Sequence, residues 1–312
     1  MFFLLLGRKR MDPIYIETYR QGGLARKIEE SRRVVSNCFF CERRCGVDRT
    51  AGEIGNCLSG VRASVSSAGP HHGEEACLRG VSGSGTIFFA GCGIGCVFCQ
   101  NHGISAGEEA GIDAGPGELA ELMLNLQQLG CHNINFVTPT HAARTILEAL
   151  PVAIEGGLKI PLVYNTGGYD TPETLALFDG LVDIYMPDFK FWSQDTAACY
   201  LDAPDYPATI RRNLLIMHRQ TGDLLIDDRS IAMRGLLVRH LVMPGLAEET
   251  RSICGWIAEN ISTETAVNVM FQYHPSHRVG FGRFRNIDRR LTMEEMHAAK
   301  ESAAAARLTR LL

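Results

Sequence analysis

The sequence predicts an α/β fold, a partial open (β/α)6 TIM-like barrel behind a small cysteine-rich N-terminal module. From residue 83 onward, short apolar runs alternate with helical patterns, which is typical of parallel βαβ units. The chain has six such runs, fewer than the eight strands of a closed barrel. Before residue 83, cysteines and glycines are crowded together instead. We therefore divide the chain into a metal-binding module at 1–82 and a barrel at 83–312.

The composition is that of an ordinary globular protein. The 312 residues are 46% hydrophobic and 21% charged, with a net charge of −4. The apolar run at 2–6 is too short for a membrane span or an export signal, and the true start is left open between Met1 and Met11. Basic residues are in excess at 8–62, but no aromatic stacking pattern accompanies them, which disfavours nucleic acid as a partner. We expect a cytoplasmic protein without a membrane partner.

The N-terminal module begins with a helical pattern at 16–35, broken by Gly22 and Gly23, and continues with four clustered cysteines. Eleven cysteines without an export signal indicate metal ligation in a reducing compartment. Four thiolates in one short segment can close around a single centre, which would stabilise a segment with little core of its own. The spacing leaves zinc and a second iron–sulfur cluster open as the centre. The four are Cys38, Cys41, Cys45 and Cys57.

The barrel elements follow from apolar periodicity and from helix start and stop signals. Pro116 opens a helix whose apolar residues recur at helical spacing until Gly130 ends it. Thr171 before Pro172 marks the cap of a later helix. Further helices are expected at 141–154 and 291–312. The six expected strands are residues 86–90, 132–138, 160–165, 181–188, 235–243 and 266–272.

Three cysteines follow the first expected strand in a C-x3-C-x2-C pattern: Cys92, Cys96 and Cys99. Glycines between them allow the backbone to curl around a bound centre. A closed zinc site would need a fourth ligand, for which His102 is the nearest candidate. An iron–sulfur cube held by three cysteines would instead keep one iron without a protein ligand.

Polar side chains follow or end the other expected strands, and active sites of such barrels gather at the carboxyl ends of strands. An arginine inside an apolar strand is costly unless an anion lies beside it. Asp188 and Lys190 are two residues apart, so a strand presents both on one face. His141 can be either a site residue or the opening of a helix. The candidate site residues are Thr138, Asn165, Asp188, Lys190, Arg239 and His274.

With Phe98 directly before the last cysteine, the C-x3-C-x2-C loop resembles the signature of radical S-adenosylmethionine (SAM) enzymes. Asn165-Thr166-Gly167, the Asp-x-Lys at 188–190 and the Arg-x4-Pro-Gly at 239–245 resemble the activating enzymes of glycyl-radical proteins. The N-terminal cysteines are similar to those of the pyruvate formate-lyase activating-enzyme homologues with an extra module. Many members of the superfamily carry Gly-Gly-Glu after the second strand, where this chain has Thr138-Pro139-Thr140-His141.

The resemblance implies a [4Fe–4S] cluster on Cys92, Cys96 and Cys99, with SAM on the open iron. It also implies reductive cleavage of SAM to a 5′-deoxyadenosyl radical that abstracts hydrogen. Arg239 would bind the SAM carboxylate. The electron donor would be flavodoxin or ferredoxin, and the substrate a glycine on a partner enzyme. The implied cofactor contacts are Phe98, Thr138, Asn165, Asp188, Lys190, Arg239 and His274.

Two other interpretations stay open on the residues alone. The first is a zinc-binding interaction module, for RNA or protein, on a catalytically silent barrel. The second is a barrel aldolase in which Lys190 forms a Schiff base with its substrate.

Overall fold

A nine-stranded sheet is the centre of the fold in the computed structural model, which describes residues 12–109, 111–280 and 282–312. Six strands run parallel, each paired with the next in chain order. No pairing of the last with the first closes the sheet among the described residues. The predicted open (β/α)6 barrel is therefore confirmed. The parallel strands are β2 (Ser84–Phe89), β4 (Ile134–Val137), β5 (Leu162–Thr166), β6 (Ile184–Pro187), β8 (Ala232–Leu241) and β9 (Ala266–Met270).

Three antiparallel strands extend the sheet beyond the predicted six. β1 (Ala63–His71) pairs with β2, and β3 (Ile112–Ala114) pairs with β1. The short β7 (Leu225–Ile226) forms an antiparallel pair with β8. β1 contains serine, glycine and proline, which are poor strand formers, so its sequence carries no strand pattern. It lies within the range that we assigned to the module, although it belongs to the barrel sheet.

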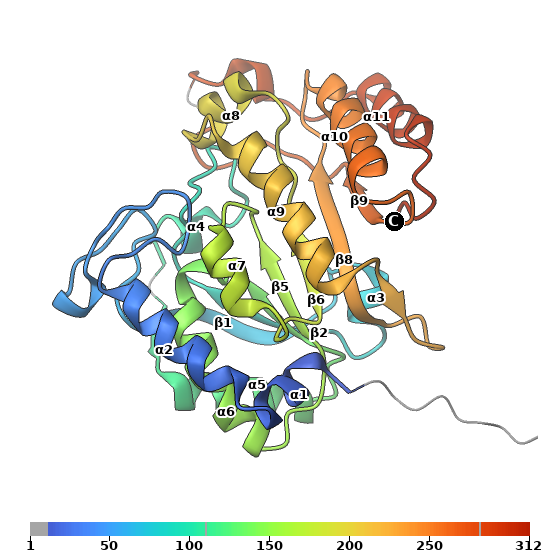
Figure 1. The fold of residues 1–312 in the computed structure, drawn as a ribbon. Coiled ribbons are helices and arrows are strands. Elements are labelled where there is room, and N and C mark those ends of the chain that lie inside the picture. Colours follow the sequence, from blue (N-terminus) through green and yellow to red (C-terminus); the bar gives the residue numbers. More distant parts are fainter. Residues whose placement is uncertain (1–11, 110, 281) are drawn as a thin grey trace, which may run out of the picture.

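Helices cover the outside of the sheet, as Figure 1 shows. α5 begins at Pro116 as predicted, and the Thr171 hydroxyl caps α7 by accepting from the Thr174 amide. The helices are α1 (Ile14–Arg20), α2 (Gly23–Val35), α3 (Ala76–Arg79), α4 (His102–Ser105), α5 (Pro116–Gln128), α6 (Ala143–Glu155), α7 (Pro172–Phe178), α8 (Gln194–Leu201), α9 (Tyr206–Thr221), α10 (Ala247–Asn260) and α11 (Met293–Ala305). Short 3-10 helices span Arg49–Ala51, Thr140–Ala142 and Arg285–Ile287.

The closing helix is shorter than predicted. α11 ends at Ala305, and Arg307 adopts a left-handed φ of 58° that a continuing helix could not contain. The chain then returns to the sheet, where Leu311 bridges Val267 of β9. The prediction of a helix to residue 312 is therefore wrong, because tertiary pairing at the sheet edge overrides local helix propensity.

The segment after α2 lies against the carboxyl ends of the strands. The Glu42 amide donates to the Tyr169 carbonyl at 3.0 Å, and the Thr171 amide donates to the Phe40 carbonyl at 3.2 Å. Arg43 donates to the carbonyls of Gly93 and Ile94, both at 2.9 Å. The N-terminal cysteines are therefore fastened beside the loop that carries the second cysteine group.

Within the described ranges, no helix has both the length and the apolar character required to cross a membrane. The two alternative starts, Met1 and Met11, and the apolar run at 2–6 lie outside the described residues.

Candidate functional site

Two adjoining cavities form a cleft at the carboxyl ends of the parallel strands. The inner one has a volume of about 150 Å³ and is lined by all three cysteines of the C-x3-C-x2-C loop. The outer one has a volume of about 250 Å³ and reaches the ends of β8 and β9. Together they approach the size of a small-molecule site. The residues that line both are Cys96, Cys99, Asn101, Asp188, Lys190 and Arg239.

The loop after β2 carries all three cysteines to the inner cavity. Gly91 and Gly95 adopt left-handed φ angles of 89° and 70°, which allow the chain to curl between the cysteines. The Ile94 amide donates to the Cys92 sulfur at 3.5 Å. Burial raises the pKa of Cys92, and it raises the pKa of Cys96 to about 12 although Lys190 opposes this shift. Burial thus favours the protonated form of both thiols.

Phe98 forms an apolar wall of the outer cavity. Its ring is buried and lies edge-on to Phe191, with 5.7 Å between the ring centroids, and tilted against Tyr273 at 6.3 Å. The residue that completes the predicted motif therefore anchors the cysteine loop to the barrel interior and shields the cleft from water.

The structure brings four predicted strand-end residues into one polar network. Arg239 donates from Nε to Asp188 Oδ1 at 3.0 Å and from Nη2 to Asn165 Oδ1 at 2.7 Å. Lys190 donates from Nζ to the other carboxylate oxygen of Asp188 at 2.6 Å. Two cations on one carboxylate fix the orientation of the side chains at the ends of β5, β6 and β8.

The network sets the charge states of its members. Burial favours a neutral Asp188, but Lys190 and Arg239 outweigh it and lower the pKa of the carboxyl. Burial likewise disfavours the charged form of Lys190, yet the Asp188 carboxylate prevails and the pKa of the ammonium is raised. The pair is therefore ionised, which leaves Lys190 without the free amine that a nucleophile needs.

Glu74 and Glu75, which sequence reasoning missed, complete this network. Glu74 lies 3.6 Å from Arg239 and accepts a hydrogen bond from Asn135 of β4 at 3.1 Å. Glu75 accepts from Asn268 of β9 at 2.8 Å. Burial raises the pKa of Glu74 to about 7, and the neighbouring Glu75 adds to the shift. The two glutamates thus link strands on opposite sides of the open barrel. No local sequence pattern could have predicted these contacts.

The end of β4 carries a strained residue. Thr138 has a φ of 58°, which costs a β-branched side chain about 1–3 kcal/mol, and its amide donates to the Asn165 carbonyl at 2.8 Å. Thr138 lines the inner cavity. His141 is buried, with Nε2 2.9 Å from the Ala90 carbonyl, and burial lowers its pKa to about 4. His141 is therefore a neutral residue at the opening of α6.

The end of β9 differs from expectation in one residue. Gln272 and Met270 line the outer cavity. His274, two residues further on, does not line either cavity, and its Nδ1 lies 3.2 Å from the Pro275 carbonyl. Its predicted contact with the cofactor stays a prediction. The signal for Gln272 was its place directly after the last apolar run.

Two of the N-terminal cysteines, Cys38 and Cys57, lie beside a buried guanidinium. Arg49 is 3% exposed and donates from Nη2 to the Cys57 sulfur at 3.3 Å. No carboxylate lies within 4.0 Å of Arg49 in the described part of the chain, and its Nε has no hydrogen-bond partner there. The pKa of Cys38 is raised by burial, lowered by Arg49, and raised again by its neighbours Cys45 and Cys57. A buried cation facing thiols fits an anionic metal–thiolate centre.

Neither cysteine group meets the geometric condition for a single metal ion. Among the described residues, three potential ligand atoms lie within 4.8 Å of one another at His102, Glu108 and His277. The sulfur atoms of the two cysteine groups lie further apart. A tetrahedral zinc site would hold its ligands closer, whereas a cube carries its thiolates on separate iron atoms.

The sequence matches no family model along its length. By fold, it is similar to SuiB of Streptococcus suis bound to S-adenosylmethionine, at 12% identity and a TM-score of 0.47, over 71% of this chain and 47% of that one. It is also similar to the cobalamin-dependent S-adenosylmethionine radical enzyme OxsB, at 11% identity and a TM-score of 0.42, over 72% and 31%. The chain thus spans less than half the length of either structure, and both scores are too low to identify a function.

A relative found by sequence covers most of both chains. The "Uncharacterized protein MJ0674" of Methanocaldococcus jannaschii is 35% identical over 287 residues, which cover 89% of this chain and 77% of the relative. The chain belongs to the family of this archaeal protein.

Proposed function

We propose that the protein is a radical SAM enzyme in which Cys92, Cys96 and Cys99 hold a [4Fe–4S] cluster and the adjoining cleft holds SAM. The observation that carries the proposal is the inner cavity, because the three thiols and the polar ends of β5, β6 and β8 all line it. Three cysteines leave one iron of a cube without a protein ligand, and that iron is where a second molecule can bind.

The residues present fit an anionic cluster. The Ile94 amide already donates to the Cys92 sulfur, and hydrogen bonds from backbone amides favour thiolates over thiols. The Lys190 ammonium lowers the pKa of Cys96 against the effect of burial. Buried thiols that would otherwise stay protonated thus have donors and a cation beside them to stabilise the charge that iron would impose.

A bound cluster of this type supplies an electron that cleaves the carbon–sulfur bond of SAM, giving methionine and a 5′-deoxyadenosyl radical that abstracts hydrogen from substrate. The protein binds and orients the reactants and excludes water. Asp188 is held ionised and is suited to accept from ribose hydroxyls. Arg239 has five N–H groups, and its contacts with Asp188, Asn165 and Glu74 leave donors for the SAM carboxylate. Thr138 stands where the Gly-Gly-Glu is missing and would contact the amino group.

The N-terminal cysteines Cys38, Cys41, Cys45 and Cys57 form a second metal site in this proposal, with an iron–sulfur cluster ahead of zinc. No three of their sulfur atoms lie within 4.8 Å of one another, and the buried Arg49 guanidinium donates to the Cys57 sulfur. The substrate would be a glycine of a partner enzyme, and the electron donor flavodoxin or ferredoxin, by likeness to the activating enzymes alone. The boundary between module and barrel at 82/83 belongs to the same proposal.

The ionised Lys190 disfavours the aldolase interpretation. A lysine that forms a Schiff base needs a lowered pKa, whereas Asp188 raises the pKa of Lys190. Borohydride trapping with a carbonyl substrate would detect a Schiff base directly, and we expect none.

The test is anaerobic reconstitution followed by iron and sulfide analysis and a dithionite-driven SAM cleavage assay. We expect 5′-deoxyadenosine from the wild type and none from Cys96→Ala. Cys199→Ala is the matched control, because Cys199 is exposed on α8 and belongs to neither cysteine group. Equal product from Cys96→Ala and the wild type, or none from any of them, would contradict the proposal.

The second site is tested by the same metal analysis. Cys41→Ala should lower the iron content to that of one cluster while the cysteine triad remains loaded. An unchanged iron content together with loss of zinc would instead assign zinc to the module.

A further inference from the structure

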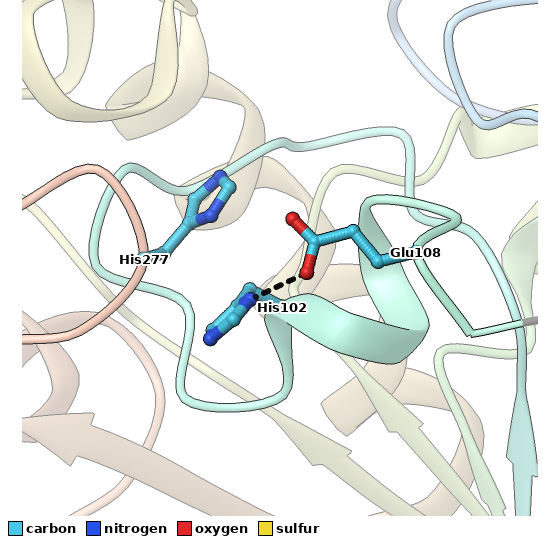
Figure 2. Close-up of side chains that lie close together, drawn as sticks. All are labelled: His102, Glu108 and His277. Atoms are coloured by element: carbon cyan, nitrogen blue, oxygen red, sulfur yellow. Dashed lines mark hydrogen bonds and ion pairs between the residues drawn. The ribbon is translucent and has the colours of Figure 1, made fainter.

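His102, Glu108 and His277 form a cluster of metal-ligating side chains outside the cleft. Figure 2 shows the three side chains turned toward one another. His102 Nδ1 lies 3.2 Å from Glu108 Oε2. The rings of His102 and His277 stack with 5.2 Å between their centroids and 18° between their planes. One ligand atom from each residue lies within 4.8 Å of the others.

The cluster joins the two sides of the open barrel. His102 begins α4, three residues after the last cysteine of the loop that follows β2, and Glu108 lies just beyond α4. His277 is in the loop that follows β9. The neighbouring Arg278 already docks this loop, since its amide donates to the Val97 carbonyl at 2.9 Å and its Nη2 to the Gly95 carbonyl at 2.8 Å.

A plain ion pair accounts for only part of the cluster. An ion pair explains why His102 and Glu108 lie close together. It does not explain the place of the His277 ring, which has no hydrogen-bond partner among the described residues. His277 also adopts a left-handed φ of 53°, a conformation that costs a histidine about 1–2 kcal/mol. Strain that brings an imidazole to this place is a reason to ask what the imidazole binds there.

The donor set matches a borderline divalent ion. Two imidazoles and one carboxylate are a known zinc combination, with a fourth position left for water. Imidazole binds metal in its neutral form. Both histidines are partly exposed, so an ion can enter from solvent.

We propose that His102, Glu108 and His277 bind one divalent transition-metal ion, best matched by zinc, which clasps the loop after β9 to the loop after β2. The clasp closes the unpaired side of the barrel beside the cleft. Asn101, which precedes His102, and Gln272, which precedes His277 in the last loop, both line the outer cavity. The ion thus fixes the two loops that form the mouth, whatever chemistry the cleft performs.

The test compares zinc binding by anaerobic, cluster-loaded wild type, His277→Ala and Glu108→Gln. The matched control is His297→Ala, because His297 pairs with Glu301 at 3.1 Å on α11 but has no third ligand among the residues that the structure describes. We expect the wild type and the control to bind one zinc equivalent more than His277→Ala. Glu108→Gln, at an exposed position, should weaken binding at least about tenfold.

Cobalt(II) separates this site from the cysteines. The cobalt(II) ion bound at this site should show ligand-field absorption without thiolate-to-cobalt charge transfer. This ligand-field absorption should be absent in His277→Ala. Zinc should also slow hydrogen exchange of the Arg278 amide in the wild type and in His297→Ala, but not in His277→Ala. Equal stoichiometry in His277→Ala and the wild type, or cobalt bound only through thiolate, would overturn the proposal. None of these readouts requires SAM, so failure of the clasp and failure of the proposed activity are distinguishable.

Discussion

Replacement of Arg239 by methionine tests whether the buried network preorganises the cleft. The guanidinium contacts Asp188, Asn165 and Glu74 at 3.0, 2.7 and 3.6 Å. Arg239→Met leaves Asp188 with Lys190, but it leaves Glu74 without a cation. Removing one partner of a buried ionic group costs about 3–5 kcal/mol. We expect a loss of that size at pH 8 and a smaller one at pH 6, where Glu74 can take up a proton.

Denaturant unfolding at both pH values measures this loss, with all variants kept anaerobic and at equal metal content. Arg251→Met is the control, because Arg251 is an exposed arginine 3.6 Å from Glu248 on α10. Its unfolding midpoint should match that of the wild type.

A double-mutant cycle with Glu74→Gln isolates the contact itself. Because a neutral glutamine no longer needs the guanidinium, the double variant should lose less than the sum of the two single variants, with a coupling energy of about 0.5–3 kcal/mol. A loss below about 1 kcal/mol for Arg239→Met, or a coupling energy of zero, would refute the reasoning.

Two further predictions concern the packing and the pH response of the site. Gly91→Ala would drive a Cβ into the Cys57 carbonyl, whereas Gly95→Ala, also at positive φ, meets no described atom within 4 Å. Gly95→Ala should cost about 1–2 kcal/mol in unfolding free energy and Gly91→Ala clearly more, with faster proteolysis at 38–57; equal costs would contradict this. The pKa of Glu74 is raised from 4.5 to about 7, so its stabilising contribution is complete below pH 4.5 and is lost as the pH rises through 7. The slope is at most about 1.4 kcal/mol per pH unit, and Glu74→Gln should flatten it.

The parallel core was predictable because apolar runs and strand ends are local signals. All six strands lie where the sequence places them, and Asn165, Asp188, Lys190 and Arg239 meet as expected for carboxyl ends of adjacent parallel strands. The sequence also required an anion beside Arg239. Asp188 is that anion inside the protein, together with Glu74.

The remaining elements depend on contacts between distant residues. Glu74 contacts Arg239, which lies 165 positions later in the chain, and no sequence periodicity predicts such a contact. The clasp residues His102 and His277 are likewise brought together only by the return of the chain after β9. β1 forms because the edge of β2 offers hydrogen bonds, whereas its own residues have low strand propensity. These three features depend on contacts between residues far apart in the chain, so local sequence patterns could not predict them.

The two cysteine groups differ in how their neighbouring cations are neutralised, and this difference predicts how each depends on metal. Arg239 has its own carboxylates, so the cleft beside the cysteine triad is formed without a bound centre. Arg49 donates to the Cys57 sulfur and to the His141 carbonyl, and no carboxylate lies within 4.0 Å of it in the described residues, so ionised thiols would be its nearest countercharge. Metal binding must then contribute directly to the folding of the N-terminal segment. Metal removal should therefore loosen residues 38–57 first, while the parallel barrel persists.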